Sequence, residues 1–105
     1  MDVIAQRNLV LRLDGRDIPV VLRLGKPEPD GRFNSWACSY EIAVGDAASS
    51  ETIHGADSLQ AIQLSLASLD HFMKRVVGNH GGELLHEDEP FVSFFESSGL
   101  TPVSK

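Results

Sequence analysis

Residues 55–82 constrain the fold more than any other stretch, because they are typical of one long amphipathic helix. Asp57 can cap the first turn, and Gln60 three residues later completes a capping box. Glycines within residues 78–82 allow a left-handed end. Apolar residues recur at intervals of three and four, which predicts one buried stripe. The stripe consists of Leu59, Ile62, Leu66, Leu69, Met73 and Val76, widened by Leu64, Phe72 and Val77.

The length and the charge of the chain limit the classes of protein to consider. A chain of 105 residues suits one hydrophobic core, so we expect a single domain over residues 1–105. The net charge is −6, and residues 33–105 carry three Lys and Arg against ten Asp and Glu. Duplex binding depends on a basic surface that neutralises phosphates, so nucleic acid is not an expected partner.

The cysteine count and the N-terminus bear on location. Cys38 is the single cysteine and cannot form an internal disulfide, which fits a reducing compartment. The N-terminus lacks the basic-then-apolar layout of a signal peptide, and no apolar run approaches the roughly 18 residues of a spanning helix. We therefore expect a cytoplasmic protein with no membrane partner.

Alternating apolar and polar residues predict strands ahead of the helix. Residues 3–13 and 18–24 alternate on either side of Asp14-Gly15, which predicts a hairpin with a two-residue or a four-residue loop. Both registers place the two apolar faces on the same side. Residues 26–32 contain two prolines and are expected to form an exposed loop that cannot continue a ladder.

The cleanest alternation lies over residues 34–44 and predicts a central strand. Its heavy face consists of Trp36, Cys38, Tyr40, Ile42 and Val44. Residues 45–49 are predicted to turn, and residues 51–54 to form a fourth strand leading into the helix. The expected fold is therefore α+β, a four-stranded antiparallel meander with one long helix packed on one face and a short C-terminal helix.

The short C-terminal helix is predicted over residues 90–99. Asp88 or Glu89 can cap it, Pro90 suits its first turn, and Gly99 can end it. A strand over residues 91–95 is the alternative, because this run is rich in phenylalanine.

One helix covers one face of a sheet, so the opposite face is the predicted binding surface. Small and apolar residues lie there among polar ones, and small residues let another layer approach closely. The candidate binding residues are Val10, Arg12, Val21, Arg23 and Ala37.

A cluster of potential metal ligands follows the long helix. It consists of His80, Glu83, His86, Glu87 and Asp88. These residue types suit a divalent ion, but the spacing matches no known metal motif, and Gly81 and Gly82 place the cluster on a loop. We predict no metal and no cofactor.

A nucleophile and base pair is the other chemistry to weigh, because Cys38 lies one strand away from His54. Cys38 shares its face with Trp36 and Tyr40, and an apolar setting disfavours the reactive thiolate. No catalytic residues are assigned, since the chain has no nucleophile elbow, phosphate loop or dinucleotide fingerprint. The sequence favours a protein that is not an enzyme.

Two short patterns stand out: Trp36-x-Cys38-x-Tyr40-x-Ile42, and Gly55-x-Asp57-x-x-Gln60-Ala61 at the start of the helix. In these patterns the chain resembles a family of short, uncharacterised bacterial proteins classed as a domain of unknown function. The resemblance covers residues 7–77 and leaves the acidic C-terminal segment outside. It implies a bacterial source and a meander-plus-helix domain, and it supplies no catalytic residues.

The function is not specified by any motif, and two hypotheses follow. The first is a small non-enzymatic interaction module that binds a protein partner, for example an acidic immunity-type binder that neutralises a basic partner. Such a module could also bind a second copy of itself through the open sheet face or an edge strand. The alternative is a small-molecule or metal-binding domain, built around Cys38, Tyr40 and His54 or around residues 80–88.

Overall fold

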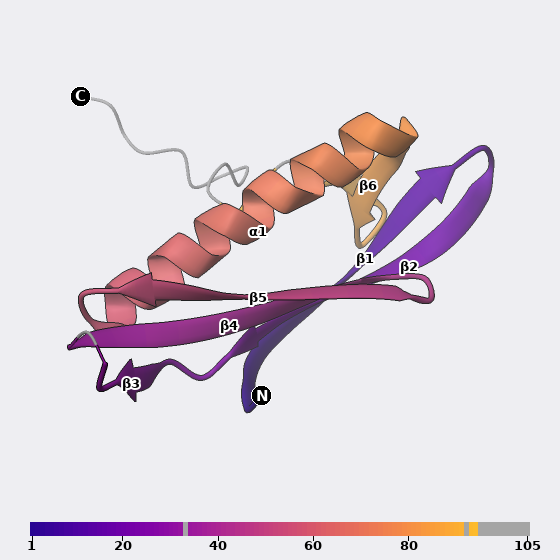
Figure 1. Ribbon diagram of the computed structural model, residues 1–105. Helices are drawn as coiled ribbons and strands as arrows, with labels where there is room; N and C mark the ends of the chain where they lie inside the picture. Colours follow the sequence, from indigo (N-terminus) through magenta and orange to yellow (C-terminus); the bar gives the residue numbers. More distant parts are fainter. Residues whose placement is uncertain (33, 92, 95–105) are drawn as a thin grey trace, which may run out of the picture.

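The computed structural model describes residues 1–32, 34–91, 93 and 94. It shows an antiparallel sheet with one long helix lying across one face (Figure 1). The elements are β1 (Val3–Leu13), β2 (Arg16–Gly25), β3 (Glu28–Asp30), β4 (Ser35–Val44), β5 (Ala47–Gly55), α1 (Ser58–His80), β6 (Glu83–His86) and β7 (Glu89–Pro90). The α+β class is confirmed, but the sheet has seven strands rather than four, and α1 is the one helix among the described residues.

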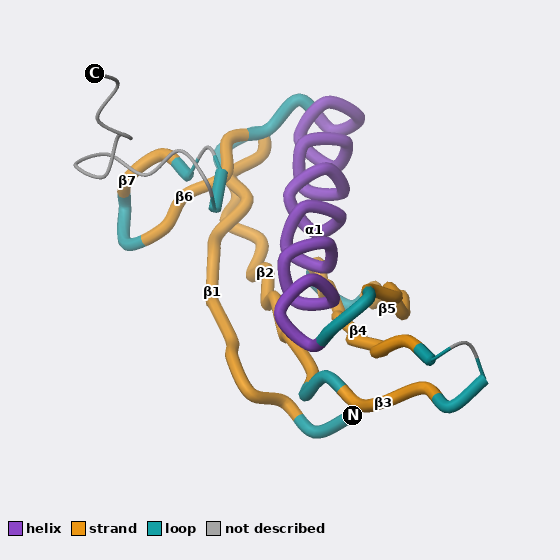
Figure 2. Tube along the Cα trace, turned by 90° about the vertical axis from the view of Figure 1, so that its left-hand side faces the viewer, coloured by secondary structure: helices purple, strands orange, loops and turns teal. Residues whose placement is uncertain are grey.

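β4 is an inner strand of the sheet, and β5 is an edge strand beside it in the described part of the chain. Ile42 of β4 pairs with Leu22 of β2 on one side and with Ser49 of β5 on the other. β3 continues the line of β2 along the first residues of β4. The strands therefore follow one another as β5, β4, β2, β1, β6 and β7, and Figure 2 shows α1 on one side of them.

The β1–β2 hairpin has the two-residue loop. Leu11 lies opposite Ile18, and the ladder runs up to Leu13 opposite Arg16. Asp14 and Gly15 both have positive φ, 51° and 76°, as a type I′ turn requires. This register places the leucines of β1 on the face that α1 covers, together with Ile18, Val20, Leu22 and Leu24 of β2.

The predicted loop over residues 26–32 contains a strand, and this part of the prediction is wrong. In β3, Pro29 lies opposite Trp36 of β4. β3 has β4 on one side alone in the described part of the chain, so the missing N–H of Pro29 leaves no ladder partner unsatisfied.

β5 is longer than predicted. It begins at Ala47 rather than at residue 51, because the turn takes up only Gly45 and Asp46. Gly45 has a φ of 58°, which suits the first central position of a tight hairpin turn.

Residues 83–90 form a hairpin, where the sequence predicted a loop up to residue 88 and the start of a helix at residue 90. β6 pairs with the end of β1, with Leu84 opposite Leu11 and Leu85 opposite Val10. Its turn residues, Glu87 and Asp88, have φ of 53° and 66°. Two left-handed residues in succession make a two-residue connection to β7 possible.

The predicted C-terminal helix is wrong in its described part. Pro90 belongs to β7, and Phe91, Ser93 and Phe94 are neither helical nor part of a strand, so the alternative strand is wrong there too. Residue 92 and residues 95–99 lie outside the described residues.

Both caps of α1 are as the sequence predicts. The Gln60 amide donates to Asp57 Oδ1 at 2.7 Å, and the Gln60 side-chain oxygen accepts from the Ala56 amide at 2.6 Å. At the other end, Gly81 is left-handed with a φ of 72° and donates to the Val77 carbonyl. These bonds satisfy backbone groups that a helix end leaves open.

The buried stripe of α1 differs from the prediction in its first half. Leu59 and Leu64 are 64% and 43% exposed, whereas Ala61 and Ser65 are fully buried. A Cβ atom on Gly55 would lie 2.5 Å from the Ala61 nitrogen, so strand and helix touch almost backbone to backbone. Only small residues fit at such a contact, and Ser65 Oγ donates to the Cys38 carbonyl across it at 3.3 Å.

The close contact at Gly55 gives a stability prediction. Gly55→Ala is expected to lower the free energy of unfolding by about 1 to 3 kcal/mol, because the backbone at Ala61 cannot yield to the added methyl group. Gly78→Ala is the control, since nothing lies within 4 Å of its Cβ position and helix propensity favours alanine by about 0.5 to 1 kcal/mol. Urea titration measures both changes; equal effects of the two variants would contradict the close contact.

Candidate functional site

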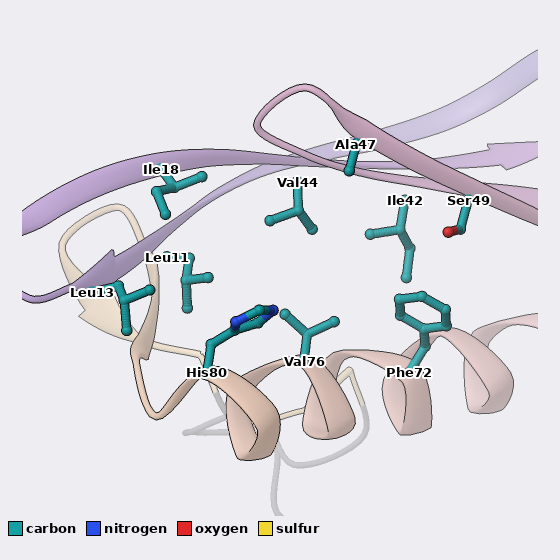
Figure 3. A pocket seen from close by; sticks show the side chains of 10 residues that line it. All are labelled: Leu11, Leu13, Ile18, Ile42, Val44, Ala47, Ser49, Phe72, Val76 and His80. Atoms are coloured by element: carbon teal, nitrogen blue, oxygen red, sulfur yellow. The ribbon is translucent and has the colours of Figure 1, made fainter.

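A cavity lies between the second half of α1 and the ends of β1, β2, β4 and β5 (Figure 3), and we call it the wedge cavity. Its volume is about 390 Å³. Helix and sheet touch at Gly55, and the twist of the strands carries the β1–β2 hairpin away from the other end of the helix. The lining residues are Leu11, Leu13, Ile18, Ile42, Val44, Ala47, Ser49, Phe72, Val76 and His80.

The wedge cavity is chemically uniform. Eight of its ten lining residues are apolar, and the two polar ones, Ser49 and His80, come from opposite walls. None of these described lining residues carries a carboxylate. A mainly apolar hollow of this volume with a few polar groups is typical of a site that takes up an apolar group.

β5 forms one rim of the wedge cavity and is an unprotected edge strand. In the described part of the chain it pairs with β4 alone. Its nine residues include no proline and no lysine, which proteins commonly use to block such edges. The short strands β3 and β7, by contrast, carry Pro29 and Pro90.

The tight turn at Gly45-Asp46 fixes which amides of β5 point outward. A two-residue turn closes with a bond between its outer residues, so Val44 and Ala47 form a hydrogen-bonded pair. Hydrogen-bonded and open pairs alternate along an antiparallel ladder. The amides that point away from β4 therefore belong to Ala48, Ser50, Thr52 and His54.

The edge and the cavity meet at the start of β5. Ala47 and Ser49 lie opposite Val44 and Ile42, on the face toward α1, and both line the cavity. Both are also exposed. The wedge cavity thus opens to solvent beside the outward-facing backbone of β5.

Glu51, the next residue on that face of β5, is exposed and held by a buried neighbour. The Tyr40 hydroxyl donates to Glu51 Oε2 at 3.3 Å and lies 2.8 Å from Ser68 Oγ. Burial raises the pKa of the Tyr40 hydroxyl; the bond from Ser68 opposes this shift and the charge of Glu51 adds to it. A carboxylate is therefore fixed near the cavity mouth.

The five predicted binding residues share the face of the sheet opposite α1, since Arg12, Val10 and Arg23 alternate with core leucines in the observed register. Arg12 pairs with Asp17 at 2.9 Å, and Arg23 pairs with Glu41 at 2.7 Å. Val21 and Ala37 are half-buried. Binding at this face stays a prediction, and its two arginines already have carboxylate partners.

Cys38, Tyr40 and His54 do not form a common site. Cys38 and Tyr40 are buried on the face toward α1, and the thiol lies 3.4 Å from the Gly25 carbonyl, to which it donates. His54 lies on the opposite face and contacts Asp30 at 3.0 Å across Ala37. The nucleophile and base pair is therefore excluded by the register.

The β6–β7 hairpin separates the residues that the sequence offered as candidate metal ligands. Glu83 lies opposite Arg12, His86 packs edge-on against Phe91 with ring centroids 6.4 Å apart, and His80 lines the wedge cavity. Over residues 1–32, 34–91, 93 and 94, no three His, Cys, Asp or Glu residues come together as a metal site.

The described end of the chain packs on the α1 side of the sheet. Buried Asp70 accepts from Ser93 Oγ at 2.9 Å and from the Phe94 amide at 3.1 Å. The Arg7 guanidinium lies 5.7 Å and 5.5 Å from the rings of Phe91 and Phe94. Residues 91, 93 and 94 thus lie on the side of the helix, and none of these three covers the predicted binding face.

A family model described as a domain of unknown function matches residues 5–93. The chain belongs to this family, DUF6968. The match takes in the β6–β7 hairpin, so the acidic segment up to Ser93 is part of the family pattern rather than outside it. Comparison with curated proteins and with solved structures gave no match. Within the described residues, α1 is too polar to cross a membrane.

Sequence reasoning offered an edge strand only as a general surface for self-association. It did not identify residues 47–55 as that strand, and it missed the cavity beside it. A signal was present: residues 47–52 contain no proline, no lysine and no large side chain other than Glu51. Such a run resembles a turn by composition, and it was predicted as one up to residue 49.

Tyr40 provides a direct check on the geometry at Glu51. Because Tyr40 is the single tyrosine, tyrosinate absorbance reports this residue alone. We expect a midpoint above the ordinary 10.0 in the folded protein. Because the pKa of Tyr40 is higher in the folded than in the unfolded state, the stability that its neutral hydroxyl contributes is complete below pH 10 and is lost as the pH rises through the folded pKa. The free energy of unfolding measured in urea should therefore fall over this pH range. It should fall less in Tyr40→Phe. An unshifted absorbance midpoint would contradict the burial of this hydroxyl.

Proposed function

We propose that this domain is a non-enzymatic protein-interaction module that binds an extended segment of a partner along β5. The observation that carries the proposal is the nine-residue unprotected edge of β5 beside the mouth of the wedge cavity. The proposal keeps the bacterial source that the family resemblance implies and the cytoplasmic setting that the sequence predicts.

Strand addition uses groups that the fold already presents. The outward amides and carbonyls of residues 48, 50, 52 and 54 are spaced to pair with a second extended backbone. Main-chain pairing supplies affinity with little dependence on sequence, and pockets beside the edge supply specificity. β5 and the wedge cavity provide both parts.

Two other surfaces are weaker candidates. The first half of β1 also has an open side among the described residues, but there Arg7 stacks on Phe91 and Phe94. The face opposite α1 presents Arg12 and Arg23 in ion pairs that a partner would have to desolvate. Neither surface combines an open edge with a cavity as large as the wedge cavity.

The test is selection from a phage-displayed library of random linear peptides, followed by binding assays on variants. Ser50→Pro removes an outward amide without breaking the β4 ladder, so it is expected to weaken the selected peptides at least tenfold. Asn8→Pro is the matched control, because the hairpin register places the Asn8 amide outward on the other open edge.

Each outcome of this selection separates the proposal from its rivals. Loss of binding with Ser50→Pro and retention with Asn8→Pro supports it. The reverse pattern, equal binding by both variants, or no selectable peptide would overturn it. Sedimentation of the protein alone that shows a dimer abolished by Ser50→Pro would instead assign the edge to a second copy.

A further inference from the structure

We infer that the segment bound by β5 carries a large apolar side chain that enters the wedge cavity and a basic residue two positions away that pairs with Glu51. This inference rests on the proposed function and specifies the chemistry of the partner. It follows from three features of the site: the small residues on the rim, the position of Glu51, and the period of a strand.

Small side chains form the rim of the wedge cavity at β5. Ala47 and Ser49 are the two β5 residues that line the cavity, and both have small side chains. A strand placed beside β5 would direct every second side chain toward α1, as β5 itself does. The side chain opposite Ser49 would pass over these small rim residues toward Phe72 and Val76.

The far wall of the cavity selects the kind of side chain. Phe72 and Val76 of α1 are half-buried and face Ile42 and Val44 across an apolar space (Figure 3). A large aliphatic or aromatic group would remove this apolar surface from water. A basic group would lose its hydration with no carboxylate among the described lining residues to pair with it.

Glu51 sets the second requirement. It lies two residues beyond Ser49 on the same face, so the next inward side chain of an added strand, about 7 Å along, would lie beside its carboxylate. Tyr40 holds one of its oxygens, and the chain carries a net charge of −6. Opposite charges across paired strands are favourable, whereas an acidic residue would be repelled.

The expected recognition pattern is therefore one large apolar and one basic residue separated by a single position. An antiparallel segment would read basic-x-apolar, and a parallel segment apolar-x-basic, because Ser49 precedes Glu51 in β5. The intervening residue would point to the other face, beside Ser50, and is expected to vary freely.

The experiment measures binding of the peptide selected above to two β5 variants. Ala47→Phe fills the wedge cavity from within and is expected to weaken binding about tenfold to a hundredfold. Ala48→Phe is the matched control, because it adds the same ring to the same strand on the opposite face. Replacing the apolar residue of the peptide with alanine should cause a similar loss in the unchanged protein and none in Ala47→Phe.

The charge requirement is tested separately. Glu51→Gln is expected to reduce affinity about twofold to fivefold at low salt, and to abolish the effect of replacing the basic peptide residue with glutamine. The inference would be overturned if the Ala47→Phe variant bound the peptide as tightly as the Ala48→Phe variant. It would also be overturned if the selected peptides lacked the apolar residue. If those peptides still depend on Ser50, the proposed strand addition survives and only the partner chemistry is wrong.

Discussion

The fold depends on the contact between the end of β5 and the first turns of α1. At Gly55 the strand backbone lies against the backbone of Ala61, and one turn later the buried Ser65 hydroxyl bonds to the carbonyl of Cys38. A side chain at Gly55 would push the helix away, so the glycine sets the distance between helix and sheet. Close packing at one end, together with the twist of the strands, leaves the other end open.

The open end gives the domain a surface that the side chains of its described residues do not fill. The apolar residues of the cavity come from every layer of the fold, yet the lining residues from β5 are only alanine and serine. A larger residue at either position would close the space from inside. The site is therefore defined as much by two small side chains as by the apolar walls, and such positions carry little signal in a single sequence.

Much of the fold could be predicted from local patterns. The capping box at Asp57, the hairpin turn at Asp14-Gly15 and the alternation around Tyr40 depend on near neighbours, and each was confirmed. Leu59 fits the helical period but is exposed, because the tight contact at Gly55 turns the side of the helix that carries Ala61 toward the sheet. The β6–β7 hairpin pairs with β1 some seventy residues earlier, and no local pattern reports such a pairing. For the same reason the sequence indicated neither the wedge cavity nor the edge beside it.

The central claim is that β5 presents an open edge, and amide hydrogen exchange of the dilute free protein tests it residue by residue. The turn at Gly45-Asp46 predicts slow exchange at Ser49, Glu51 and Ile53, whose amides face β4, and fast exchange at Ala48, Ser50 and Thr52, whose amides face outward. Residues 20–24 of β2, which have β1 on one side and β4 on the other, should show no such alternation. Uniformly slow exchange along β5 would mean that its edge is already covered, and would contradict the account.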